Sequence, residues 1–156
     1  MGEHARLLLL KHLAAANVAE KVDLSKLKQQ HSFTAKHISR FCSGNDDNSK
    51  YQLLSELGIP LELKDVVCEI CRVVSNRSAG LLAAALSALI LHTGQTRVKI
   101  GLGGSLFLKH PTYKQMLEEW LSKLLPEDIS WEVVSVEDGS GVGAALVAAV
   151  AEKLKI

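Results

Sequence analysis

The spacing of apolar residues predicts helices over most of the first two thirds of the chain. Three helices are expected, at residues 2–20, 51–57 and 62–92. Residues 23–43 are more polar and are expected to hold short helices, one of them beginning after Thr34 as its N-cap. Every residue from Gly44 to Ser49 favours turns, which predicts a surface loop.

The apolar pattern changes after Gly94, which is expected to end the long helix. Apolar and polar residues alternate in 96–102, as is typical of a strand. The remaining elements are expected to be a helix from Pro111, a strand at 129–136, a glycine-rich loop and a final helix. Two strands joined by a helix are most simply parallel. The sequence therefore predicts an α/β fold, rich in helix, with a small parallel sheet near the C-terminus.

The chain of 156 residues is expected to form a single compact unit, because domains of this size are common. Residues 1–94 would be mainly helical, and residues 96–156 would follow the order strand, helix, strand, helix. A net charge of +1 and few aromatic residues give no basis for a nucleic-acid partner. The longest apolar run, 79–91, has 13 residues, whereas a membrane span needs about 20. We therefore expect a buried core helix there and no membrane span.

The three cysteines are Cys42, Cys68 and Cys71. Cys68 and Cys71 have the spacing that metal and redox sites use. No second pair of cysteine or histidine residues lies close by in the sequence to complete a tetrahedral set. Buried thiols are therefore favoured, no metal site is predicted, and a reducing compartment, most simply the cytoplasm, is expected.

No residue of the sequence is predicted to be catalytic. His110 precedes a proline, and a structural role at a helix entry is favoured over acid–base chemistry. Glu137 and Asp138 have the oxygen ligands that Mg²⁺ prefers, but solvated charges at a loop are favoured.

Two glycine-rich turns, 101–104 and 138–143, directly follow the predicted strands. Ligands of parallel α/β sheets lie outside the carboxyl ends of the strands. Chain reversal after a parallel strand also uses glycine, so a phosphate-bearing ligand and an ordinary packed connection both stay open.

Four segments, in order, resemble the C-terminal part of the large domain of the hexokinase/glucokinase family, which has the actin-like ATPase superfold. They are MGEHARLLLLKHL (1–13), VCEICRVVSNRSAGLLAAAL (67–86), VKIGLGGSLFLKHP (98–111) and SVEDGSGVGAAL (135–146). The resemblance implies part of an ATP-dependent kinase of glucose or a related hexose, with ATP and Mg²⁺ as cofactors of the parent enzyme. The alternative is a non-catalytic interaction or regulatory module descended from that lobe.

The resemblance also implies which residues would bind ATP. The ATP-side residues would be Gly104, Ser105, Leu106, Phe107, Leu108 and Lys109. Ser105 and backbone amides would face the phosphates, and Leu106 and Phe107 would face adenine. A second segment aligns with a threonine-arginine-glycine run that helps to hold ATP in the family. Its residues are Gln29, Gln30, His31, Ser32 and Phe33.

The sequence departs from the family at three of these places. Gly103 stands where the family has an aspartate, Gln30 replaces an arginine, and Val142 replaces a lysine. The loss of the arginine removes a natural phosphate partner. The resemblance implies that the glycine loop and helix at 135–150 are mainly a packing and hinge element rather than a phosphate site.

The family's main phosphate loop, sugar pocket and catalytic aspartate would all precede Met1. Phosphoryl transfer depends on those parts for positioning and charge stabilisation. We therefore expect the chain alone to be inactive, to bind no cofactor tightly, and to meet a hexose only through the missing part. A sheet of few strands has exposed edges, so another chain or segment is expected to cover them.

Overall fold

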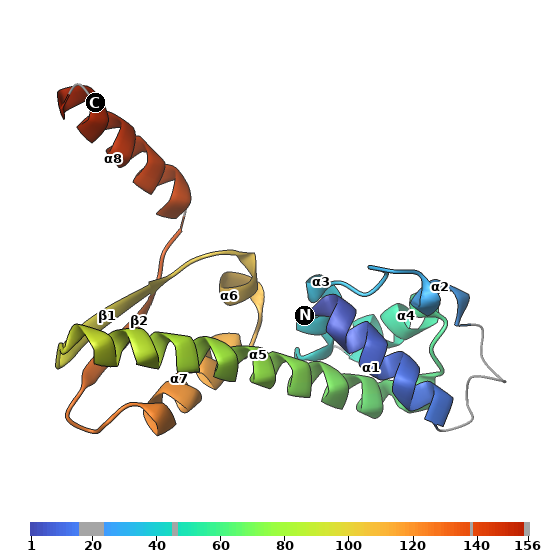
Figure 1. The fold of residues 1–156 in the computed structure, drawn as a ribbon. Coiled ribbons are helices and arrows are strands. Elements are labelled where there is room, and N and C mark those ends of the chain that lie inside the picture. Colours follow the sequence, from blue (N-terminus) through green and yellow to red (C-terminus); the bar gives the residue numbers. More distant parts are fainter. Residues whose placement is uncertain (16–23, 45–46, 138, 155–156) are drawn as a thin grey trace.

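The computed structural model describes residues 1–15, 24–44, 47–137 and 139–154. Figure 1 labels the elements along the chain. The helices are α1 (Gly2–Ala15), α2 (Ser25–Lys28), α3 (Ala35–Phe41), α4 (Asp47–Leu57), the 3₁₀ turn η1 (Leu61–Leu63), α5 (Lys64–Thr93), α6 (Ser105–Lys109), α7 (Tyr113–Leu124) and α8 (Gly139–Leu154). The strands are β1 (Arg97–Leu102) and β2 (Ser130–Ser135). The predicted helix-rich α/β fold is confirmed.

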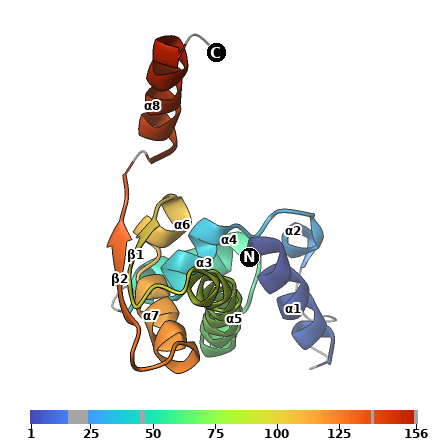
Figure 2. The same ribbon diagram turned by 60° about the vertical axis from the view of Figure 1, so that its left-hand side comes forward.

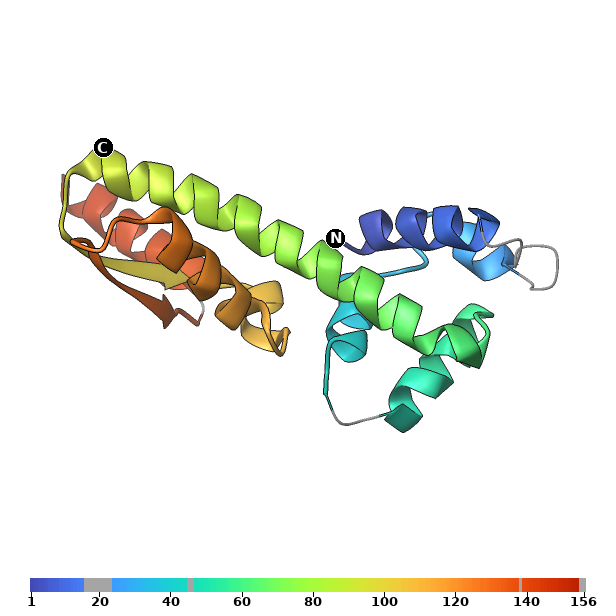
Figure 3. The same cartoon turned by 90° about the horizontal axis from the view of Figure 1, so that it is seen from below.

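The 30-residue helix α5 is shared by two hydrophobic cores. Its first half packs against α1, α3 and α4, and its second half packs against α7 (Figures 1 and 3). Leu9 and Leu54 are fully buried in the first core, and Leu117 and Leu121 are fully buried in the second. Because one continuous helix contributes to both cores, the two halves of the molecule are held together along its length.

The stretch Leu61–Thr93 is long and apolar enough, by length and composition, to cross a membrane. The apolar run that stood out in the sequence covers less than half of it. In the structure this stretch includes α5, whose buried residues belong to both cores. These cores bury only part of its apolar surface: 33% of the apolar window is buried, and Val73, Leu81, Leu89 and Leu91 are exposed.

The sheet consists of β1 and β2, paired in parallel from Arg97 opposite Ser130 to Leu102 opposite Ser135. Ile100 and Val133 are buried in the second core, so one face of the sheet is covered by helices (Figure 2). The other face carries an exposed ion pair between Lys99 and Glu132, at 3.2 Å. The predicted alternation and the parallel pairing of the strands are confirmed.

The carboxyl ends of the two strands meet at one edge of the sheet. The backbone N–H of Val136 donates to the carbonyl oxygen of Leu102 at 2.8 Å. A Cβ atom at Gly103 would lie 2.8 Å from the Val136 carbonyl oxygen, so no side chain fits there without a shift. Gly104 then adopts φ 97°, and α6 begins at the next residue. The sequence predicted only a turn at α6, because a helix of five residues is too short to show a period.

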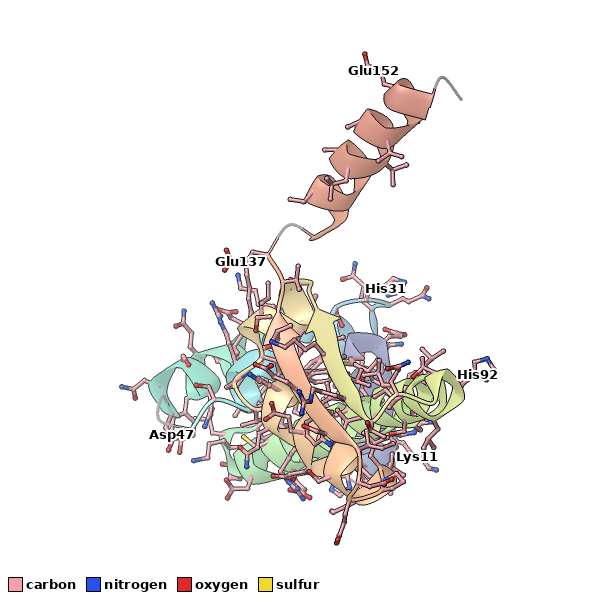
Figure 4. All side chains as sticks on the ribbon, turned by 90° about the vertical axis from the view of Figure 1, so that its left-hand side faces the viewer. Lys11, His31, Asp47, His92, Glu137 and Glu152 are labelled. Atoms are coloured by element: carbon pink, nitrogen blue, oxygen red, sulfur yellow. The ribbon has the colours of Figure 1, made fainter. Side chains whose placement is uncertain are left out.

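Helix α8 projects away from the rest of the molecule (Figure 1). Glu137 lies at its foot and Glu152 at its far end (Figure 4). None of its described side chains is buried, and Val147 is 70% exposed. The glycine-rich loop was expected over 138–143, but α8 already begins at Gly139, so that prediction is wrong at its C-terminal end. Asp138 lies outside the described residues.

Three other element boundaries differ from the predictions. α1 is described to Ala15, and the rest of the predicted helix lies outside the described residues. α4 begins at Asp47, within the predicted loop, where the Asp47 carboxylate accepts a hydrogen bond from Lys64 at 3.1 Å. Pro111 precedes α7 instead of lying in its first turn, because Thr112 is the N-cap.

Candidate functional site

A cleft of about 620 Å³ lies between α3 and α6. It is lined by Ala35, Lys36, Ser39, Arg40, Ser43, Ser105, Leu106, Lys109 and Pro111. The residues from α3 recur with helical spacing and therefore form one face of that helix. The cleft lies beside the carboxyl ends of the strands, because α6 begins three residues after β1 ends.

The lining of the cleft favours an anion. Lys36 and Arg40 on one wall and Lys109 on the other are exposed cations. Among the residues that the structure describes, the lining includes no carboxylate, and none of these three cations forms an ion pair. The hydroxyls of Ser43 and Ser105 also line the cleft and can donate hydrogen bonds, whereas the Ser39 hydroxyl donates to the Ala35 carbonyl oxygen at 3.1 Å. Phosphate oxygens are acceptors of both kinds of donor.

The wall formed by α3 is anchored by aromatic packing at its inner face. Phe33 and Phe41 stack with ring centroids 6.0 Å apart, and both are buried in the first core. The ring Nδ1 of His37 accepts a hydrogen bond from the Thr34 backbone N–H at 3.1 Å. Burial lowers the pKa of His37, which favours the neutral ring that this bond requires. With its inner face fixed, α3 presents its polar face to the cleft.

The structure brings part of the first predicted ATP segment into the cleft. Ser105, Leu106 and Lys109 line it. Phe107 instead belongs to the second core, at 8% exposure, so it is not available as an adenine wall in this conformation. Leu108 is exposed but does not line the cleft.

The second predicted segment, 29–33, does not line the cleft, whose lining begins at Ala35. Gln29, Gln30 and His31 are exposed, and Phe33 is in the core. The signal that sequence reasoning missed lies just after this segment, in the polar residues of α3 at 36, 39 and 40 and in Ser43 just beyond the helix. A search for helical spacing of cations and serines would have found it.

Segment 27–31 is instead held against α1 by hydrogen bonds to Arg6 and Glu3. Arg6 donates to the carbonyl oxygen of Leu27 at 2.9 Å and, through its Nε, to Glu3 at 2.8 Å. Glu3 in turn accepts the backbone N–H of His31, which has φ 64°, at 3.1 Å. The hydrogen bond from Arg6 holds the pKa of Glu3 at about 2. The glutamate and arginine of the MGEHAR segment therefore have a structural role.

A hydrogen-bonded cluster joins the ends of both cleft helices. His110, the C-cap of α6, lies 3.0 Å through its Nε2 from the Ser75 hydroxyl on α5. Cys42, the C-cap of α3, lies 3.9 Å through its Sγ from the same hydroxyl. His110 is 5% exposed, and burial lowers its pKa. This places His110 in a structural position beside a helix end.

The cysteines behave as partly or fully buried thiols. Cys71 is fully buried, and Cys42 and Cys68 pack against the same core. All three are free thiols, and burial raises the pKa of each. The described part of the chain contains no group of three or more His, Cys, Asp or Glu residues arranged to hold a metal ion.

Helices that flank a small parallel sheet are the part of the actin-like ATPase fold that this chain represents. The sequence pattern of the family described as Hexokinase matches residues 1–150, and the chain belongs to this family.

Two relatives and one solved structure show how much of the family the chain represents. It is 38% identical to hexokinase-2 of Rattus norvegicus, over 99% of this chain and 18% of that protein. It is 33% identical to a hexokinase of Brugia malayi, over 99% of this chain and 28% of that protein. The structure of the Schistosoma mansoni hexokinase complexed with glucose matches 94% of this chain and 34% of that one, with a TM-score of 0.80 and 23% identity. The chain therefore spans less than a third of the two hexokinase relatives and about a third of the solved structure.

Proposed function

We propose that this chain supplies one side of the ATP site of an ATP-dependent hexose kinase. The observation that carries the proposal is the cleft between α3 and α6, in which cations and hydroxyl groups from both walls face the same space. A phosphate chain in this cleft would meet Arg40 and Lys36 from α3 and Lys109 from α6. Arg40 would take the part of the arginine that Gln30 replaces, because a guanidinium binds phosphate oxygens through two N–H groups.

The cleft also has a less polar part that suits a nucleoside. Leu106 and Pro111 lie among the lining residues of the α6 wall, and Ala35 lies on the α3 wall. We propose that adenine lies along these residues while the hydroxyl of Ser105 donates to a phosphate oxygen. This assignment keeps Ser105, Leu106 and Lys109 from the predicted segment and adds the polar face of α3.

The remaining functions of the parent enzyme would lie in other segments. The hexose, the Mg²⁺ that accompanies ATP and the catalytic base would be held by parts of the family that this chain does not contain, and the chain would form one unit of the larger domain. With one side of the site only, we expect an ATP dissociation constant of about 1 mM, or about −4 kcal/mol. Three free thiols support a reducing compartment such as the cytoplasm.

An ATP titration followed by backbone amide shifts tests the proposal. We expect shifts at both walls, in residues 36–43 and 104–111, saturating at several millimolar ATP. Adenosine is the matched control, because it lacks the phosphates and should shift the α6 wall only weakly. Shifts centred on residues 139–143, or no shifts at 10 mM ATP (about ten times the expected dissociation constant), would contradict the proposal.

The alternative, a non-catalytic interaction module, has its own supporting observation. Helix α8 exposes the apolar side chains Val142, Leu146, Val147 and Val150. An apolar surface of this kind is typical of a protein contact. The same ATP titration separates the two functions, since an interaction module that has lost the nucleotide site would show no shifts in the cleft.

A further inference from the structure

The Ser75 hydroxyl touches the residue that directly follows each of the two cleft helices. Cys42 follows α3 and His110 follows α6, and their distances to Ser75 Oγ are 3.9 Å and 3.0 Å. Ser75 itself is fully buried on α5, the helix that joins the two cores. One side chain of the central helix therefore contacts both walls of the cleft at their ends.

The directions of the hydrogen bonds follow from the donors that are present. The backbone N–H of Thr112 donates to His110 Nδ1 at 3.3 Å, which assigns the ring proton to Nε2. His110 Nε2–H therefore donates to Ser75 Oγ. The Ser75 hydroxyl proton is donated to the carbonyl oxygen of Cys71 at 2.8 Å. The second lone pair of Ser75 Oγ accepts the weak S–H donor of Cys42.

This arrangement uses the full capacity of the serine, which has one donor and two acceptor positions. The bonds join α3, α5 and the turn between α6 and α7. Because Ser75 is buried, a movement of the α6 wall would break the hydrogen bond from His110, and a movement of the α3 wall would break the weaker contact with Cys42.

We propose that Ser75 is a positioning residue that sets the separation of the two cleft walls. Its consequence for ligand binding rests on the proposed nucleotide function. Arg40 and Lys109 lie on opposite walls. A phosphate chain between the walls can bind both side chains only if the distance between the walls suits both contacts. Charge-assisted hydrogen bonds have a narrow range of lengths, about 2.7–2.9 Å, so a small change in separation weakens binding to both cations together.

Ser75→Ala tests the proposal, and Ser87→Ala is the matched control. Ser87 is on the same helix and 5% exposed, and its hydroxyl has no hydrogen-bond partner among the described residues. We expect Ser75→Ala to shift the backbone amide signals of both walls, at 42–43 and at 109–112, without ATP. Ser87→Ala should shift neither group. Shifts confined to α5, or to one wall, would overturn the proposal.

ATP affinity provides the second measurement. We expect Ser75→Ala to raise the ATP dissociation constant about fivefold, the factor that corresponds to the net worth of one hydrogen bond. Ser87→Ala should leave it unchanged. If wild-type protein binds ATP and Ser75→Ala binds it equally well, the positioning role is wrong and the nucleotide site stands. If wild-type protein binds no ATP, the proposed function is wrong, and the amide comparison decides the role of Ser75.

A second variant covers the case in which Ser75→Ala does not fold. His110→Phe keeps a planar ring of similar size but removes the bond to Ser75 from the other side. We expect it to shift the same amides of both walls, with the Cys42 and Ser43 signals as the readout on the far wall. A shift limited to the α6 side would overturn the proposal, because His110 would then act only on its own wall.

Discussion

The indole nitrogen of Trp120 on α7 donates a hydrogen bond to the side-chain oxygen of Asn76 on α5, at 2.9 Å. One turn further along α5, a Cβ atom at Gly80 would lie 3.1 Å from the same indole ring. The small residue lets the two helices approach, and the hydrogen bond fixes the orientation of the ring. This contact lies near the middle of α5, where Trp120 packs against the second core.

Removing the acceptor of this bond is expected to destabilise the protein. We predict that Asn76→Ala lowers the free energy of unfolding by about 1 kcal/mol, because the indole N–H loses its partner. Trp120→Phe removes the donor, and the double variant should cost less than the sum of the two single changes. Urea unfolding of the four proteins measures the coupling. Strict additivity would show that the bond contributes nothing to stability.

Glycine is required at position 2 by a close approach of two backbones. A Cβ atom there would overlap the carbonyl oxygen of Phe33, so the start of α1 would have to move away from the segment before α3. We predict that Gly2→Ala lowers the free energy of unfolding by about 2–3 kcal/mol. Gly44→Ala is the control, because a Cβ atom at Gly44 meets nothing within 4 Å. Equal midpoints of the two variants in urea would contradict the packing seen at α1.

The regular elements could be predicted from the sequence because each has its own local period. Alternation identified both strands, and helical spacing identified α5. The short helix α6 and the helical glycines of α8 could not be predicted in this way, since five residues are too few for a period and glycine favours no single conformation.

The candidate site depends on contacts between residues far apart in the sequence. The bond from Arg6 to the Leu27 carbonyl spans 21 positions, and the one between Ser75 and His110 spans 35. No local sequence pattern indicates such pairs. The family resemblance predicted the residues of the α6 wall, whereas the residues of the α3 wall were identified only in the structure. The chemistry of Lys36 and Arg40 was visible in the sequence, but their position opposite Lys109 was not.

Acid is expected to destabilise the protein through His110. Burial lowers its pKa from the ordinary 6.5, so the unfolded chain takes up this proton at a higher pH than the folded chain does. The contribution of neutral His110 to the free energy of unfolding is therefore greatest above about pH 6.5. It is lost as the pH falls from there through the lower pKa of the folded state. His37 shifts in the same direction and adds to the same loss.

The comparison of wild type with His110→Phe checks this dependence. The His110 ring packs against the ring of Tyr113, with centroids 5.8 Å apart, and burial is the cause of its lowered pKa. We predict that the urea midpoint of the wild type falls between pH 7 and pH 5 (a window around the ordinary histidine pKa). His110→Phe should show a smaller fall. If the urea midpoints of the wild type and His110→Phe fall by the same amount, the acid sensitivity comes from other groups.

The charges of the cleft should control ATP affinity. We predict that Arg40→Ala raises the ATP dissociation constant about tenfold and Lys109→Ala about threefold, since the guanidinium makes paired contacts with phosphate. Lys11→Ala is the control, because Lys11 is an exposed cation on α1, outside the cleft (Figure 4). Calorimetry at two salt concentrations adds a second check: affinity should fall with salt in the wild type and less steeply in Arg40→Ala. If Lys11→Ala raises the ATP dissociation constant as much as the cleft variants do, ATP is attracted by the general positive charge and not by the cleft.

Helix α8 should contribute almost nothing to the stability of the chain. Val147 is 70% exposed, so its truncation to alanine removes no core contact, and alanine has the higher helix propensity. We predict a change of less than about 0.5 kcal/mol for Val147→Ala, against a loss of about 2–5 kcal/mol for Leu121→Ala, whose side chain is fully buried on α7. Urea unfolding at two protein concentrations, tenfold apart, separates folding from association. A loss above about 1 kcal/mol for Val147→Ala that grows with concentration would show that α8 is buried against a second copy in solution. A loss independent of concentration would show that α8 packs against its own chain, contrary to the arrangement in Figure 1.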